Sequence, residues 1–196
     1  MMVNLTVRLL LCREEKVWRS FLVPLDIDFT TLHTIIQWGF GWEDTHPHEF
    51  TYKKEKLIID EDVHDMARAC KSFDERIALF YKYGALLSDF IPPAKRIDYE
   101  YDFGDNWKHV IKVGKTQLVE GGPYALCTGG QGDTPPEDCG GPTGYEYLLY
   151  VLSDPTHERY KEKMEWIGYD GVVTFPFDID SVNARLKRME FIEGEP

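Results

Sequence analysis

The stretch YEYDFGDNWKH, residues 99–109, combines side chains that could carry out acid–base or metal chemistry. Aspartate, glutamate and histidine act as general acids or bases and as metal ligands. The loop PPEDCGG, residues 135–141, adds two neighbouring carboxylates to the aspartates and the histidine of that stretch. The sequence therefore offers five candidate catalytic residues: Asp102, Asp105, His109, Glu137 and Asp138.

Strand pairing bears on whether the residues of the first stretch can act together. Residues 96–103 and 107–119 read as two strands of a hairpin, and an odd-length loop centred on Asp105 gives one aromatic face and one face of matched charges. The pairs expected are Phe103 with Trp107, Tyr101 with His109, Tyr99 with Ile111, Asp102 with Lys108, and Asp98 with Lys112. In this register Asp102 and His109 point to opposite faces, so they cannot bind one ion. This favours a structural hairpin, with His109 in an aromatic layer and the aspartates bonded within the turn.

Two other groups of residues could bind a metal ion. Cys127 and Cys139 offer thiolates, and His46 and His48 flank Pro47 and offer imidazoles, which suits zinc or another divalent ion. The spacing C-x11-C matches no common zinc motif, and buried cysteines and turn histidines explain the same residues more simply. We therefore predict no cofactor, with zinc or another divalent metal as the alternative.

The charge of the chain restricts its partners. Among 196 residues, 22 are Lys or Arg and 34 are Asp or Glu, which gives a formal net charge of −12. Such a chain repels the phosphate backbone of nucleic acids, so nucleic-acid binding is disfavoured. The four cysteines are widely spaced, and no apolar run reaches the length of a membrane-spanning helix. We expect a cytoplasmic protein with no membrane partner.

Hydrophobic periodicity indicates an α+β fold. We expect strands at 3–11 and 17–24, a helix over about 30–39 that Thr30 or Thr31 caps and Gly39 and Gly41 end, and a hairpin at 49–59. A helix over 72–84 and a shorter one over 85–90 precede the hairpin of 96–119, and a glycine-rich loop at 121–144 precedes three amphipathic helices. Strands that come as consecutive hairpins predict a mainly antiparallel sheet. The prediction is a single domain over 1–196, with helices packed on the sheet and a helical C-terminal third.

Four sequence blocks resemble those of the Ri-plasmid ORF-three-like family, whose members are often labelled TnpR resolvase-like. The blocks are VWRSFLVP, TLHTIIQWGFGWEDTHPHEF, YEYDFGDNWKHVIKV and PPEDCGGPTGYEYLL, and the later pieces WIG and VNARL fit as well. The resemblance implies a single α+β domain and association with mobile elements, but no particular reaction. The family pattern has a further cysteine before PPEDCGG where this chain has Thr134, so a cysteine cluster around that loop is incomplete here.

Taken together, these patterns favour a non-enzymatic binding or interaction module for an unknown protein or small molecule. Its expected surface joins the 121–144 loop to the 102–109 turn and comprises Trp42, Asp105, Trp107, Glu137 and Asp138. The alternative is a metal-dependent hydrolase of phosphoesters that uses the Asp, His and Glu candidates. A further alternative is a nucleic-acid-associated protein, which the net charge opposes.

Overall fold

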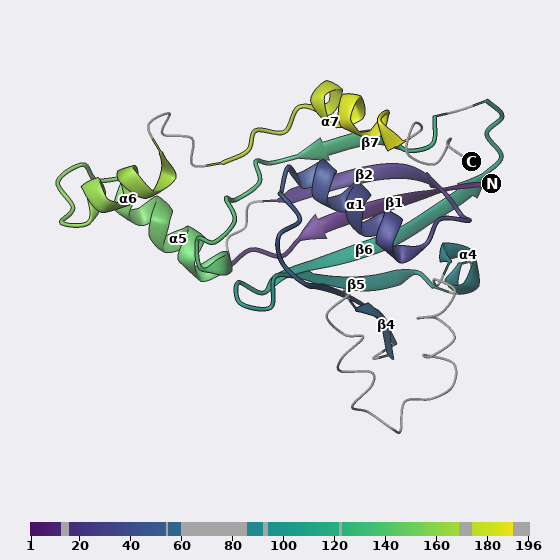
Figure 1. Cartoon of the computed structure of the whole chain (residues 1–196), viewed down its shortest axis with the longest axis horizontal. Helices are drawn as coiled ribbons and strands as arrows, with labels where there is room; N and C mark the ends of the chain where they lie inside the picture. Colours follow the sequence, from purple (N-terminus) through teal and green to yellow (C-terminus); the bar gives the residue numbers. More distant parts are fainter. Residues whose placement is uncertain are drawn as a thin grey trace.

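A seven-stranded antiparallel sheet forms the centre of the computed structural model, which describes residues 1–12, 16–53, 55–59, 86–91, 94–121, 123–168 and 174–189 (Figure 1). The strand order is β4-β3-β5-β6-β1-β2-β7, and every neighbouring pair is antiparallel. The strands are β1 (Met2–Leu9), β2 (Val17–Pro24), β3 (His48–Tyr52), β4 (Glu55–Ile59), β5 (Arg96–Tyr101), β6 (Trp107–Gln117) and β7 (Leu126–Gln131).

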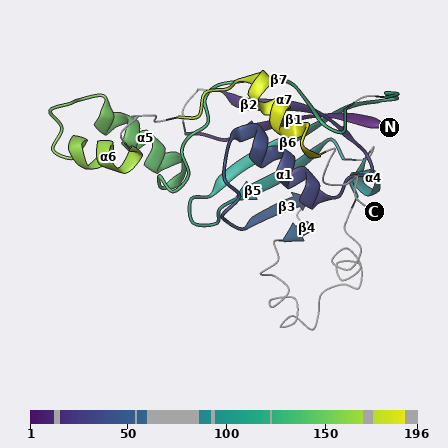
Figure 2. The same ribbon diagram turned by 45° about the horizontal axis from the view of Figure 1, so that its top comes forward.

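Helices cover one face of this sheet and extend beyond one of its ends. α1 (Phe29–Phe40) and α7 (Ile179–Leu186) lie on the same face, and α4 (Leu87–Phe90) lies near one end of it (Figure 2). α5 (Gly141–Leu152) and α6 (Tyr160–Ile167) form an arm beyond the opposite end. The α+β prediction with a mainly antiparallel sheet is confirmed, whereas the expected helix over 72–84 lies outside the described residues.

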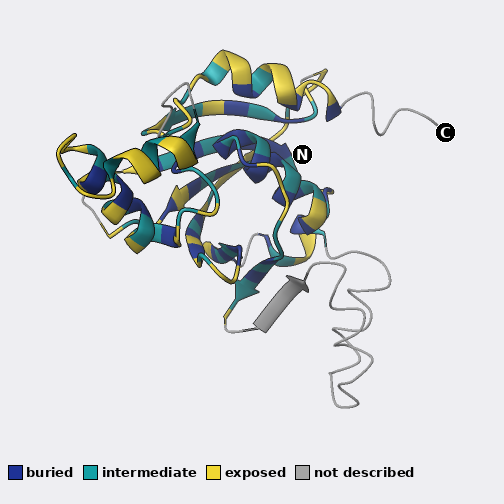
Figure 3. Ribbon diagram, turned by 60° about the vertical axis from the view of Figure 1, so that its left-hand side comes forward, coloured by how far each residue is buried: buried dark blue, intermediate teal, exposed yellow. Residues whose placement is uncertain are grey.

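The helix-covered face of the sheet holds the hydrophobic core. In β1 the alternating residues Val3, Leu5 and Val7 are fully buried beneath α1. The opposite face of the sheet carries polar side chains, such as the exposed Lys108 of β6, as an antiparallel sheet with one solvated side should. In Figure 3 buried residues alternate with less buried ones along the strands of the sheet. No helix in the described ranges is long and apolar enough to cross a membrane.

Helix α1 begins and ends at residues that differ in part from those expected. Asp28, rather than Thr30 or Thr31, is the N-cap, and its carboxylate accepts a hydrogen bond of 2.7 Å from the Thr31 backbone N–H. Gly41 ends the helix with a φ of 83°. Gly39 does not end it but lies inside, where a β-carbon would meet the Phe21 ring at 2.3 Å.

The predicted faces of the β5–β6 hairpin are correct, but the predicted register is wrong by two residues. Tyr101 pairs with Trp107 and Tyr99 with His109, and all four side chains are buried on the helix-covered face. Asp102 and Asn106 adopt φ values of 57° and 56°, which a strand does not accommodate, so the loop spans 102–106.

The register shift changes the residues that flank the aromatic face. Phe103 becomes an exposed loop residue. Glu100, instead of Asp102, lies opposite Lys108. Lys112 lies opposite Arg96 instead of Asp98. Arg96 forms an ion pair with Asp98.

The glycine-rich loop predicted over 121–144 contains a strand that sequence analysis missed. β7 pairs with β2 at the sheet edge. Its glycines at 129 and 130 have low strand propensity, so the sequence did not predict a strand there. The guanidinium of Arg19, which is almost fully buried, donates to the Gly39 carbonyl at 2.9 Å, the Gln131 carbonyl at 3.0 Å and the Thr134 hydroxyl at 3.0 Å. These bonds join β2, α1 and the end of β7, and thereby fix the start of the PPEDCGG loop.

Two buried histidines should make the fold sensitive to acid. Burial lowers the pKa of His109 to about 3, and burial together with the adjacent His33 lowers the pKa of His48 to about 3. In the unfolded chain both imidazoles have a pKa of about 6.5. Between about pH 6.5 and 3 the unfolded chain therefore binds more protons, so acidification lowers the free energy of unfolding.

We predict that, when the pH falls from 7 to 5, protonation of each of these histidines in the unfolded chain lowers the free energy of unfolding by about 2 kcal/mol. Urea denaturation at the two pH values should show a drop that is smaller by about this amount in His109→Gln. His157→Gln, in the connection between α5 and α6, should keep the wild-type drop. An equal drop in wild type and His109→Gln would contradict the prediction, whatever the absolute stability of the variant.

Candidate functional site

Three segments of the chain meet at the hydroxyl of Tyr101, the last residue of β5. This hydroxyl donates to one carboxylate oxygen of Glu137 and accepts a hydrogen bond of 3.1 Å from the Thr45 backbone N–H. The other oxygen of Glu137 accepts from the Glu43 backbone N–H at 2.7 Å. The segment after α1, the end of β5 and the PPEDCGG loop are thereby held together.

The protonation of Tyr101 favours this arrangement. Burial, and then the hydrogen bond and charge of Glu137, raise the pKa of Tyr101 well above its usual value. The phenol therefore keeps the proton that it donates to Glu137. Trp42 stacks on Tyr101 with ring centroids 5.3 Å apart, and its Nε1–H donates to the Pro135 carbonyl at 3.0 Å.

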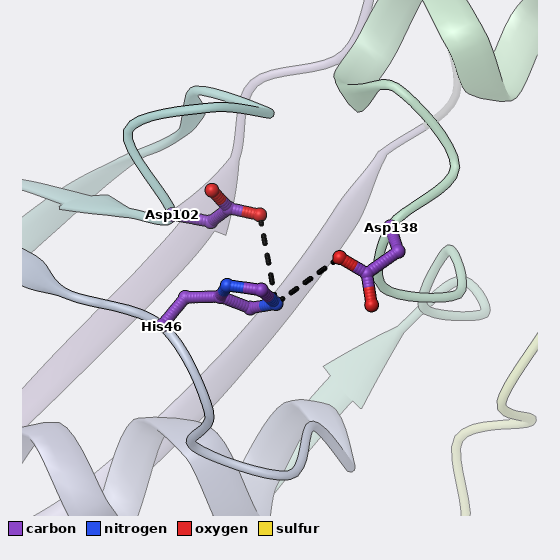
Figure 4. Close-up of side chains that lie close together, drawn as sticks. All are labelled: His46, Asp102 and Asp138. Atoms are coloured by element: carbon purple, nitrogen blue, oxygen red, sulfur yellow. Dashed lines mark ion pairs between the residues drawn. The ribbon is translucent and has the colours of Figure 1, made fainter.

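The residues that directly follow these three anchors converge on one point (Figure 4). His46 follows Thr45, Asp102 follows Tyr101, and Asp138 follows Glu137. Nε2 of His46 lies 3.2 Å from Oδ1 of Asp138 and 3.8 Å from Oδ2 of Asp102. All three ligand atoms lie within 4.8 Å of one another, which is close enough for them to surround a single ion.

The turn of residues 102–106 orients the Asp102 carboxylate. Oδ1 accepts hydrogen bonds from the backbone N–H groups of Gly104 at 2.8 Å and Asp105 at 3.2 Å. These bonds leave Oδ2 directed at His46. Asp102 is thus a turn residue through one oxygen and a candidate ligand through the other.

The 121–144 loop and the 102–109 turn meet through Asp105. Its carboxylate accepts from the Gly140 N–H at 3.1 Å. Gly141 packs so closely on the Asp105 backbone that a β-carbon would lie 2.0 Å from the Asp105 carbonyl oxygen. This contact sets the position of the loop segment that carries Glu137 and Asp138.

Other candidates from the sequence lie apart from this cluster. His109 and Trp107 are buried in the aromatic layer, where both contact Trp42, and Nδ1 of His109 lies 3.0 Å from the Trp107 carbonyl. His48 stacks on His33 with centroids 3.5 Å apart.

Neither cysteine belongs to a cluster of three metal-ligating side chains in the described part of the chain. Cys127 is buried in β7, and its backbone exchanges two hydrogen bonds with the Asn183 side chain. Burial, and then Asp105, raise the pKa of Cys139 to about 12, so the thiol stays protonated and makes a poor ligand.

A cavity of about 370 Å³ opens beside the cluster. Its lining combines three acidic residues, Glu43, Glu137 and Asp138, with three apolar ones, Trp166, Ile167 and Phe175. Trp166 and Phe175 were not predicted as site residues, because their segments are distant in sequence from the other lining residues. Asp102 lies outside the lining, whereas Asp138 belongs to both the cavity and the cluster.

The contact between Gly141 and Asp105 gives a prediction with a matched control. Gly141→Ala should lower the free energy of unfolding by at least about 3 kcal/mol, because its φ of 68° is unfavourable for alanine and its β-carbon would overlap a backbone oxygen. Gly121 has a similar φ of 64° with no atom within 4 Å, so Gly121→Ala should cost only about 1 kcal/mol. Equal losses in chemical denaturation would show that the contact does not matter.

Comparisons with known proteins agree with this fold. The family described as "Plasmid pRiA4b ORF-3-like protein" matches residues 1–186. The uncharacterised protein y4hQ of Sinorhizobium fredii (strain NBRC 101917 / NGR234) is 35% identical over 177 residues, which cover 90% of this chain and 82% of that protein. The crystal structure of MM3350 from Methanosarcina mazei Go1, a protein of unknown function, is 32% identical with a TM-score of 0.70 and covers 91% of this chain and 96% of that one. The chain belongs to the plasmid pRiA4b ORF-3-like family.

Proposed function

We propose that the protein is a non-enzymatic binding module whose site holds a divalent metal ion through His46, Asp102 and Asp138. The observation that carries the proposal is Nε2 of His46, which is buried and makes no hydrogen bond although it faces carboxylate oxygens of both aspartates. A buried polar atom that makes no hydrogen bond is costly. A cation between the three ligand atoms removes that cost and the repulsion between the two carboxylates.

The spacing of the ligand atoms is compatible with an ion after small side-chain movements. Ligands about 2.1 Å from one ion lie roughly 3 to 3.5 Å apart. The separation of His46 and Asp138, 3.2 Å, already meets this requirement, and that of His46 and Asp102, 3.8 Å, is slightly long. The Asp138 side chain is 69% exposed and has room to adjust.

The donor set favours a metal that accepts both nitrogen and oxygen ligands. One imidazole and two carboxylates suit Zn²⁺ or Mn²⁺ better than Mg²⁺ or Ca²⁺, which prefer oxygen ligands only. The turn amides that hold Oδ1 of Asp102 act as the outer hydrogen bonds that orient a metal ligand. Three protein ligands leave coordination positions for water or a bound molecule.

The metal-dependent hydrolase of phosphoesters is the second candidate, and the surroundings of the site weigh against it. His109, its candidate general base, lies in the aromatic layer, and both oxygens of Glu137 accept hydrogen bonds. The three carboxylates of the cavity repel a phosphate, as the net charge of −12 repels a nucleic acid. Binding without hydrolysis is therefore the function that we propose.

We also propose that the protein is cytoplasmic and associated with mobile elements. Cys12, Cys127 and Cys139 are free, which is compatible with a reducing, cytoplasmic location. An association with mobile elements rests on the plasmid origin in the family description.

Protein purified without a metal-affinity tag should bind about one equivalent of Mn²⁺ or Zn²⁺ in isothermal titration calorimetry. Asp102→Asn should weaken this binding at least about tenfold, because it removes Oδ2 while its remaining oxygen can still accept from the turn amides. Asp98→Asn, a charge loss of the same size on an exposed strand face, should bind like wild type. The absence of stoichiometric binding, or equal affinities in the two variants, would refute the metal site.

A further inference from the structure

We infer that the cavity beside the metal cluster binds an organic cation, an alkylammonium or guanidinium group on an apolar stem. The inference goes beyond the metal site and shares only Asp138 with it, so either can fail alone. Four segments that lie far apart in the sequence build the cavity: the loop after α1, the PPEDCGG loop, the end of α6 and the segment before α7.

The charge of the cavity selects a cation. Three of its eight lining residues are carboxylates, and none of the eight is lysine, arginine or histidine. A divalent ion in the cluster would offset the charges of its own ligands, Asp102 and Asp138, and would leave those of Glu43 and Glu137. The cavity therefore stays negative with or without the metal, and an anionic ligand is repelled in both cases.

One of these carboxylates is already positioned. Two hydrogen bonds, from the Tyr101 hydroxyl and the Glu43 backbone N–H, hold Glu137 in place. The carboxylate therefore loses little side-chain freedom when a ligand binds. Glu137 therefore lines the cavity with a carboxylate whose orientation is fixed before a ligand binds.

The apolar residues of the lining suit the apolar stem of such a ligand, and their aromatic rings suit its cationic group. Trp166 is 44% exposed and Phe175 is 39% exposed, which is high for large aromatic side chains. Aromatic faces attract ammonium and guanidinium groups, tryptophan most strongly. The ammonium of Lys163 lies 5.8 Å from the centroid of the Trp166 ring, so this ring already takes part in such a contact.

The size of the cavity restricts the ligand to a small molecule or a single side chain. A volume of about 370 Å³ lies at the lower end of the range for small-molecule sites. The same chemistry is offered by a free amine and by a lysine or arginine side chain of another protein. The ligand class is therefore a small cation with a few methylene groups, from either source.

Calorimetric titrations with n-butylammonium, n-butylguanidinium, n-butanol and butyrate test the inference. We expect at least one of the two cations to bind at least tenfold more tightly than butanol, and butyrate not to bind. Equal binding of the cations and butanol, or binding of butyrate alone, would overturn it. A capped Gly-Lys-Gly peptide identifies the source: tighter binding than n-butylammonium indicates a protein side chain, and weaker binding indicates a free amine.

Variants separate this site from the metal cluster. Trp166→Ala and Glu43→Gln should each weaken binding of the cation at least fivefold, whereas Tyr150→Ala, which removes an exposed aromatic ring outside the lining, should have no effect. Trp166→Ala should keep wild-type affinity for Mn²⁺, and Asp102→Asn should keep binding of the cation. Equal effects of Trp166→Ala and Tyr150→Ala would refute the cavity site and leave the metal proposal intact.

Discussion

The hydrogen bond between Tyr101 and Glu137 is the interaction on which the whole site depends. It links the phenol of Tyr101, whose ring is buried in the aromatic layer, to the carboxylate of Glu137 in the PPEDCGG loop, which follows the edge strand β7. Thr45 joins the same hydroxyl from a third segment. Because the candidate metal ligands are the next residues along the chain, hydrogen bonds among Thr45, Tyr101 and Glu137 bring the three candidate ligand side chains to one place. Precision at the site thus derives from bonds one residue away, on elements fixed by the core.

The aromatic layer beneath that bond stabilises the fold and also prevents His109 from acting as an acid or a base. Trp42 stacks on Tyr101 and contacts His109 edge-on, so the ring of His109 is packed on several sides by other rings. Such a histidine is neutral, contributes apolar packing, and is poorly placed to exchange a proton with a substrate. His46, by contrast, lies at the border of the layer, where its ring contacts Tyr101 and its Nε2 faces the carboxylates. The packing role of His109 and the proposed ligand role of His46 therefore differ because the two rings lie at different depths in the layer.

Sequence patterns predicted the elements well because hydrophobic periodicity encodes which face of a strand is buried. They predicted the register of the β5–β6 hairpin wrongly because Asp102 and Asn106 take left-handed conformations, which their residue types permit but do not require. β7 was missed because glycines have low strand propensity, although Gly130 leaves the space that the Phe177 ring fills. The ligand cluster could not be assembled from the sequence, since His46, Asp102 and Asp138 come from three segments joined only by tertiary contacts. Asp102 and Asp138 were predicted together as candidate catalytic residues and His46 as a candidate metal ligand, but nothing in the sequence indicated that the three converge, and the aromatic residues of the cavity left no local signal.

Asp138 connects the two proposed ligands, because it belongs both to the metal cluster and to the cavity lining. An ion held by Asp138 reduces the negative charge that a neighbouring ammonium group experiences, so the two ligands should weaken each other's binding. Such coupling is reciprocal, because the free energy of the doubly bound state does not depend on the order of binding. Its size is limited by solvent screening, since the Asp138 side chain is largely exposed, whereas Asp102 is nearly buried. A ligand that carries a separate lone-pair donor, which an ammonium group itself lacks, would reverse the sign when that donor fills an open position on the metal, because the donor gains a bond that the metal-free site cannot offer. The sign of the coupling therefore distinguishes a cation that only occupies the cavity from one that reaches the metal.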